Sequence, residues 1–272
     1  MAPPVPFRLK YSPRSPIRVA LHLVGLGLHD VRDVSVKGLE RIRAAGAVYA
    51  EFYTAILTGT PHKELEAFLG RPVQLLDRLG VEAGGKDLVE EARHKEVCLL
   101  TAGDPLTATT HTDLLVRAHA AGVQVRIVHG SSIYSAAPGL LGLQHYKFGR
   151  TTTLVRPEPI WSPTSPFDAV AENHARGLHT LVLLDIKADA GYFMAASEGL
   201  RLLLDLAHRT GNVWFTGDTP AGVVARAGSD QGVRRTGTVA ELARQDFGPP
   251  LHCLVIPGPL QVVEQEAWDL LG

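Results

Sequence analysis

Two short glycine motifs, each at the end of an apolar run, constrain most strongly what this chain can fold into. Gly-Leu-Gly-Leu at residues 25–28 follows the apolar residues 19–24, and Gly-Asp-Pro-Leu at residues 103–106 follows residues 97–101. An apolar run that stops at glycine is typical of a buried parallel strand that ends at the carboxyl edge of a sheet. Open α/β sheets bind ligands at that edge. The two motifs together therefore predict one crevice for a small molecule, and they favour an enzyme.

The N-terminal half alternates between strand and helix patterns. We expect strands at residues 19–24, 47–52, 97–101 and 122–129, and helices at 36–43, 63–69, 88–94 and 113–121. Thr110 with Asp113 matches a capping box and is expected to open the last of these helices. Strands that alternate with helices indicate a largely parallel sheet.

The C-terminal half also reads as α/β, with more hairpin-like spacing. We expect a helix at 132–141, a strand at 180–186, a helix at 197–209, strands at 222–226 and 252–256, and a last helix from about residue 260. Four prolines make residues 156–167 a loop. The predicted division is a flexible Pro/Arg-rich extension at 1–18, an N-terminal α/β domain at 19–131 and a C-terminal α/β domain at 132–272.

Composition excludes several classes of protein. The net charge of −1 provides no general basic field, so nucleic acid is not expected as a partner. No apolar run is long enough to cross a membrane, and residues 1–18 contain no signal-peptide core. Cys98 and Cys253 each lie in an apolar run, which predicts buried free thiols and a reducing, cytoplasmic location. The 12 histidines show no paired metal-ligand spacing, so no metal is expected.

The first glycine motif also permits a dinucleotide-binding interpretation. Glu51 lies at a strand end, where such folds place the carboxylate that binds a ribose hydroxyl. However, Asp30 occupies the third glycine position, and Asp33 adds a second negative charge. These carboxylates would repel a pyrophosphate at a helix N-terminus. The motif therefore indicates a tight turn, or the close approach of backbone to a different nucleoside.

In the second motif, Pro105 restricts the backbone of Asp104 and so orients its carboxylate. One interpretation is a local Asx-turn, in which Asp104 bonds only to neighbouring backbone. The other makes the loop and the small polar residues 107–111 the floor of a site for an adenosine or amino-acid moiety.

Longer segments carry a family resemblance. In chain order they are residues 25–30 with Asp33, 50–54, 103–106 with 108–111, 129–135, 146–150, 177–187, 225–229 and 246–250. In these segments the chain resembles the diphthine synthases, S-adenosylmethionine-dependent methyltransferases of the tetrapyrrole-methylase-like class. The similarity extends from about Leu21 to Trp268 and departs from the family at His29. So many segments in one order are far more specific than either glycine motif.

The resemblance implies two α/β domains, a homodimer, and S-adenosylmethionine in the cleft between the domains. The cofactor-binding residues that it implies are Leu28, Asp104, Thr107, Ser132, Ile133, Leu184, Ala227 and His252. It also implies that the protein substrate is elongation factor 2. The methyl acceptor would be the amino nitrogen of a 3-amino-3-carboxypropyl group attached to a histidine of that factor.

Neither the residues nor the resemblance identifies a catalytic base. Asp30, Asp33, Glu51 and Asp185 are candidates because each lies at a strand end or glycine loop, although turn caps are the commoner role. His252 similarly has the alternative of a core histidine. We expect the loop 156–167, with Trp161 and Phe167, to form one lip of an open cleft. The competing functions are a methyltransferase for a tetrapyrrole or corrinoid precursor or another small molecule, and a non-catalytic nucleoside-binding regulator.

Overall fold

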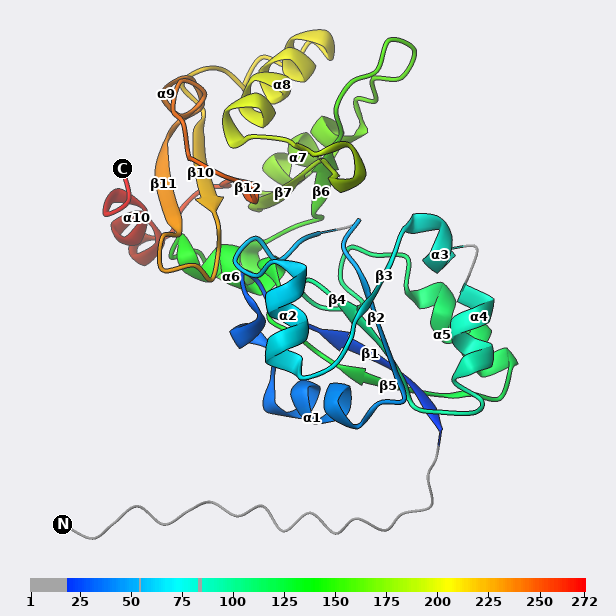
Figure 1. Cartoon of the computed structure of the whole chain (residues 1–272). Coiled ribbons are helices and arrows are strands. Elements are labelled where there is room, and N and C mark those ends of the chain that lie inside the picture. The colour runs from blue at the N-terminus through cyan, green and yellow to red at the C-terminus, as the bar shows by residue number, and fades with distance from the viewer. Residues whose placement is uncertain (1–18, 54, 83–84) are drawn as a thin grey trace, which may run out of the picture.

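A computed structural model describes residues 19–53, 55–82 and 85–272 of the chain. Two five-stranded sheets dominate it, and each is covered by helices (Figure 1). The expected boundary between residues 131 and 132 falls between the last strand of the first sheet and the next helix, and that division remains a proposal. The extension expected for residues 1–18 lies outside the described residues.

The first sheet has the strand order β3-β2-β4-β1-β5, and its strands pair in parallel. Its strands are β1 (Ala20–Gly25), β2 (Ala47–Glu51), β3 (Gln74–Leu76), β4 (Val97–Thr101) and β5 (Gln124–Val128). Both central strands, β1 and β4, are buried along their whole length. This explains why their sequences are nearly continuous apolar runs.

Helices cover both faces of the first sheet because alternate residues of each strand point in opposite directions. On β1, Leu23 packs with α4 and α5, whereas Val24 packs with α1 and α2. The helices are α1 (Val36–Ala44), α2 (His62–Leu69), α3 (Arg78–Glu82), α4 (Gly85–Glu91) and α5 (Thr112–Ala120). The parallel α/β architecture expected for this half is therefore confirmed.

The second sheet has the order β11-β10-β12-β7-β6 and is mixed, because β6 and β7 are parallel and the other pairs are antiparallel. Its strands are β6 (Thr152–Leu154), β7 (Thr180–Leu184), β10 (Pro220–Ala225), β11 (Val233–Thr238) and β12 (His252–Ile256). A small hairpin, β8 (Ile186–Lys187) with β9 (Tyr192–Phe193), follows β7 directly.

Two helical layers sandwich the second sheet. One contains α7 (Ser165–Ala175), α8 (Ala196–Arg209) and α9 (Val239–Leu242), and the other contains α6 (Ile133–Leu140) and α10 (Val262–Asp269). Short 3-10 turns are η1 (Val31–Asp33), η2 (His145–Lys147) and η3 (Ala188–Ala190). Both cysteines are buried free thiols, as expected. Among the described residues, no helix is long and apolar enough to span a membrane.

Two local expectations were wrong. Thr110 does not cap α5, because the N-cap residue is His111 and its side chain makes no capping hydrogen bond. The loop expected at 156–167 ends earlier, because Ser165 begins α7 and Pro166 occupies its first turn, where proline removes no helical hydrogen bond. Phe167 is consequently 1% exposed in the core beneath α7 and cannot form a lip of the cleft.

Candidate active site

A cavity of about 610 Å³ lies between the two sheets. The N-terminal half contributes the loops after β1, β2 and β4, and the C-terminal half contributes the ends of β7 and β10 and the start of β12. The structure brings together at this cavity all eight residues named in the sequence analysis as cofactor-binding candidates: Leu28, Asp104, Thr107, Ser132, Ile133, Leu184, Ala227 and His252. Its volume is typical of a small-molecule site.

Close contact between glycines brings the strand ends together at the cavity. A Cβ atom placed on Gly25 would lie 2.5 Å from the carbonyl oxygen of Gly103 and 2.6 Å from the backbone nitrogen of Gly130. Neither atom can move away easily, because both belong to the backbone. The loops after β1, β4 and β5 can therefore meet at this point only because Gly25 and Gly130 lack side chains.

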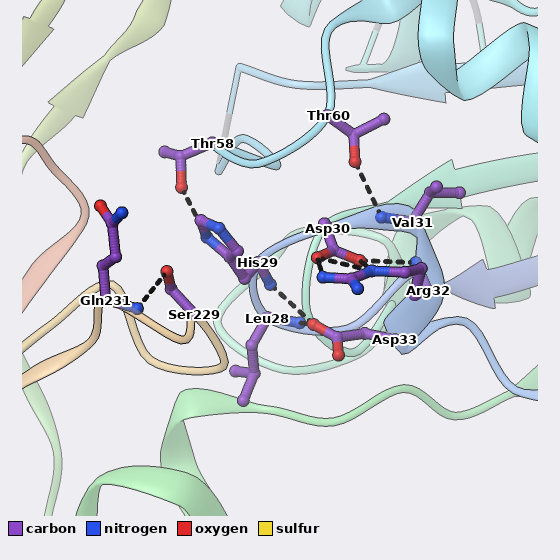
Figure 2. A network of polar contacts seen from close by, with 10 residues as sticks. All are labelled: Leu28, His29, Asp30, Val31, Arg32, Asp33, Thr58, Thr60, Ser229 and Gln231. Carbon is purple, nitrogen blue, oxygen red and sulfur yellow. Dashed lines mark hydrogen bonds and ion pairs between the residues drawn. The ribbon is translucent and has the colours of Figure 1, made fainter.

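The turn that carries Leu28 is held by Asp33. The Asp33 carboxylate accepts hydrogen bonds from the backbone N–H groups of Leu28 at 3.1 Å and of His29 at 2.8 Å (Figure 2). The His29 ring reaches across to the hydroxyl of Thr58, with 3.1 Å between Nδ1 and Oγ1. Leu28 is thus presented to the cavity by an ordered turn rather than by a phosphate-binding loop.

Asp104 performs the local bonding of an Asx-turn and also joins two loops. One carboxylate oxygen accepts the N–H of Leu106 at 3.0 Å and the hydroxyl of Thr107 at 3.3 Å. The other accepts Nδ1–H of His129 at 2.7 Å and the N–H of Gly130 at 3.3 Å. Asp104 therefore makes the local bonds expected of an Asx-turn and also ties the cavity floor together, and its role as floor for a bound ligand stays a prediction.

Ser132 and Ile133 reach the cavity from the start of α6. Ser132 is the N-cap residue, and its hydroxyl accepts the N–H of Tyr134 at 3.3 Å. This capping bond sets the direction of the first helical turn and so places Ile133 at the cavity wall.

His252 lines the cavity with both ring nitrogens already bonded. Its Nδ1 accepts the N–H of Ala196 at 3.1 Å, and its Nε2 donates to the carbonyl of Pro249 at 3.0 Å. Because a backbone N–H can only donate and a carbonyl can only accept, this arrangement requires the neutral ring. Burial also lowers the pKa of His252. Its ring therefore offers the cavity a face rather than a free hydrogen-bonding atom.

Three of the four candidate bases are committed elsewhere. Asp30 pairs with the Arg32 guanidinium at 2.6 Å, and this hydrogen bond lowers the pKa of Asp30. Asp33 holds the turn described above. Glu51 is fully buried 3.7 Å from Nε2 of His111. Of the four, Asp185 alone lines the cavity.

Several cavity residues could not be identified from the sequence motifs. Thr101, at the end of β4, is 3% exposed, and its hydroxyl lacks a hydrogen-bond partner among the described residues. The loop after β2 adds Ile56. A polar residue closing an apolar strand was the signal available for Thr101.

The fit of S-adenosylmethionine to these residues rests on two observations. A buried orphan hydroxyl at the cavity wall is what a polar ligand atom would satisfy, since leaving such a group unpaired is costly. Leu28, Ile133 and Leu184 supply apolar walls for a nucleoside. Within the described ranges, no cluster of three or more metal-ligating side chains occurs.

Comparisons with known proteins agree with this architecture. The family model described as Tetrapyrrole (Corrin/Porphyrin) Methylases matches residues 20–243. The fold and the inter-sheet cavity thus define a methyltransferase of the tetrapyrrole methylase class.

More similar relatives narrow the assignment. The diphthine synthase of Methanococcus maripaludis (strain C5) is 48% identical over 251 residues, covering 92% of this chain and 98% of the relative. That of Methanocaldococcus jannaschii is 48% identical over 253 residues, with the same coverage. A crystal structure of a diphthine synthase superposes with a TM-score of 0.84 at 36% identity, covering 93% of this chain and 96% of the other. The chain belongs to the diphthine synthase family.

Proposed function

We propose that this chain methylates the 3-amino-3-carboxypropyl-histidine of elongation factor 2, with S-adenosylmethionine as methyl donor. The observation that carries the proposal is the single cavity lined by all eight residues that the family resemblance assigns to the cofactor. An identity of 48% to a curated diphthine synthase, over 92% of this chain and 98% of the relative, supports the same reaction.

When bound, S-adenosylmethionine supplies a methyl group on a positively charged sulfur. The chain's own residues would hold donor and acceptor in line, because positioning accounts for much of the catalysis of such displacements. The apolar walls at Leu28, Ile133 and Leu184 exclude water and disfavour a charged amine. Burial against these walls therefore favours the neutral, nucleophilic form of an acceptor amine once its proton has been removed.

The segment between β6 and α7 suits a macromolecular acceptor. It projects as a long loop from the C-terminal half (Figure 1). Near its tip, Glu158 and Trp161 exchange two backbone hydrogen bonds, and Ile160 is 99% exposed and Trp161 52% exposed. The base of the loop is tied to the cavity, because the N–H of Arg156 donates to the Asp185 carboxylate at 2.9 Å. We assign this loop as the lip that contacts elongation factor 2.

A small-molecule methyltransferase of the same fold is not favoured, because the relatives that match over nearly the whole chain are diphthine synthases. The family resemblance further supports a homodimer that works in the cytoplasm, where elongation factor 2 acts. Sedimentation analysis of the purified chain tests the dimer.

The proposed function is tested with two acceptors offered side by side. The purified chain is incubated with S-adenosylmethionine and either elongation factor 2 carrying the aminocarboxypropyl histidine or a tetrapyrrole precursor. We expect the mass of the elongation factor to increase by that of the added methyl groups, and the mass of the tetrapyrrole to stay unchanged. The reverse pattern would assign the chain to small-molecule methylation.

A further inference from the structure

Two carboxylates line the cavity among the described residues, and they differ in their free bonding capacity. Asp104 already accepts from four protein donors. Asp185 accepts from one, the backbone N–H of Arg156, which bonds Oδ2 at 2.9 Å. Its Oδ1 makes no hydrogen bond within the described residues. A carboxylate with an open oxygen at a cavity wall is suited to bind an ammonium group.

The position of Asp185 is fixed by its backbone. Its carbonyl accepts the N–H of Met194 at 3.0 Å, which closes the β8–β9 hairpin onto the end of β7. Met194 thereby anchors the backbone of Asp185, and Arg156 anchors its carboxylate. A group held in this way can direct a bound amine without rearrangement of the chain.

The positively charged side chains near Asp185 also differ in whether they already have bonding partners. Lys187 is paired with Glu158 at 2.8 Å. The guanidinium of Arg226 donates to the carbonyl groups of Phe247, Pro249 and Gln231. Both charges are therefore committed within the protein.

Arg156 is the exception. Its guanidinium lies 4.7 Å above the Tyr192 ring and makes no ion pair or hydrogen bond within the described residues. The Tyr192 hydroxyl in turn donates to Glu198 at 2.8 Å, which holds the ring in place. The ring supports the guanidinium by cation–π attraction while leaving its N–H donors available. A planar guanidinium with free donors is suited to a carboxylate.

We propose that Asp185 and Arg156 together bind the amino-acid end of the methyl acceptor, with the ammonium on Asp185 and the carboxylate on Arg156. This inference rests on the proposed function and names how its acceptor is recognised. The Arg156 backbone N–H bonds the Asp185 carboxylate, so the two residues are adjacent where the loop meets the cavity. An α-amino acid carries the matching pair of opposite charges on one carbon.

The Asp185 carboxylate then takes a proton from the bound ammonium. The neutral nitrogen uses its lone pair to form a bond to the methyl carbon, and the carbon–sulfur bond breaks with its electrons left on sulfur. The products are a methylated ammonium, a neutral thioether and a protonated Asp185, which returns its proton to solvent. Asp185 is therefore a catalytic residue, and Arg156 binds the acceptor without joining the proton transfer.

Two variants separate these roles. Asp185→Asn keeps an acceptor for the Arg156 N–H but removes the charge, and it should lower kcat about 10²-fold. Arg156→Gln should raise KM for the elongation factor about tenfold or more while kcat changes little. Arg156→Lys should recover part of that KM, because charge is restored without the planar donor pair. Asp189→Asn and Arg235→Gln, at exposed residues outside the cavity lining, are the matched controls.

Calorimetry with S-adenosylhomocysteine shows whether each variant retains the cofactor site. Unchanged cofactor binding with the kinetic split above is the expected result. Loss of cofactor binding in Asp185→Asn would overturn the inference by assigning this carboxylate to the cofactor. Kinetics of both variants equal to the controls would overturn it while leaving the proposed function standing. A wild-type chain that leaves the precursor unmethylated would overturn the proposed function itself, and this inference with it.

Discussion

The buried carboxylate of Asp104 and the exposed ring of His129 are joined by a hydrogen bond of 2.7 Å. Their side chains are 9% and 72% exposed, respectively. The contact links the loop after β4 to the loop after β5, and so closes the cavity floor. A residue that sequence motifs place at the ligand is therefore also a structural tie between two strands.

Asp104→Ala should weaken cofactor binding and lower stability together. S-adenosylmethionine is expected to bind the wild-type chain in the micromolar range, as an order of magnitude. Removal of the carboxylate leaves the Leu106 and Gly130 donors unpaired, which lowers stability. The loss of a fixed, charged hydrogen-bond partner for the cofactor should cost about 1.5–3 kcal/mol in binding free energy. Calorimetry alongside denaturant unfolding measures both effects. Unchanged binding in a folded variant would remove Asp104 from the site.

Gly25→Ala should strongly destabilise the chain. The added methyl would clash with the backbone of Gly103 and Gly130, and neither loop can retreat without opening the cavity. Gly139→Ala is the matched control, since nothing lies within 4 Å of a Cβ at that helical position. The control should be neutral or stabilising by about 0.5–1 kcal/mol. Equal thermal midpoints for the two variants would contradict the close approach of the three glycines.

Replacing Trp161 should impair action on the protein acceptor and leave cofactor binding unchanged. The exposed indole and Ile160 lie at the tip of the projecting loop, and neither residue lines the cavity. The measurement is the methylation rate of the double variant Trp161→Ala, Ile160→Ser against that of the wild-type chain, at a limiting concentration of elongation factor. By contrast, Phe167→Ala should cost about 3–5 kcal/mol in stability, because that side chain is buried. Wild-type KM in the loop variant would remove the loop from acceptor contact.

Glu264 should make the chain sensitive to acid. Burial raises its pKa, but hydrogen bonds from Gln261 and Gln144 N–H, together with Lys147 and His179, outweigh this and lower the pKa to about 2. Since the folded pKa lies below the unfolded value, the stabilisation is complete above pH 4.5 and is lost as pH falls toward 2.

Glu264→Gln should remove this part of the pH dependence of the unfolding free energy, on the order of 3 kcal/mol. Glu266→Gln, an exposed neighbour on the same helix, should retain it. Denaturant unfolding across pH 2 to 6 makes the comparison. Parallel curves for the two variants would show that Glu264 does not carry the acid response.

The central strands and the cavity loops could be predicted from sequence because burial leaves a direct trace there. Val97–Thr101 and His252–Ile256 are largely apolar segments, and the predicted bounds match β4 and β12. The edge strand β11 carries Arg234 and Arg235, both exposed, so its sequence shows no apolar pattern. An edge strand can bury few side chains, so apolar periodicity in the sequence does not reveal that it pairs with a sheet.

The candidate site, too, could be predicted from sequence only in part. A motif indicates which residues lie at a sheet edge, but it does not show which side chains are already bonded. Asp33 and Asp185 were equal candidates in sequence. They separate because Asp33 accepts two backbone N–H groups of its own turn, whereas Asp185 faces the cavity. Which carboxylate is already bonded depends on the folded backbone around it, and it cannot be inferred from the motif alone.

The most direct test of the account locates the transferred methyl group. The purified chain is incubated with methyl-deuterated S-adenosylmethionine and elongation factor 2 that carries the aminocarboxypropyl histidine, and the product is sequenced by tandem mass spectrometry. The account predicts label on the amino nitrogen of that one side chain. Label on another residue, or none despite cofactor binding measured in the same sample, would contradict it.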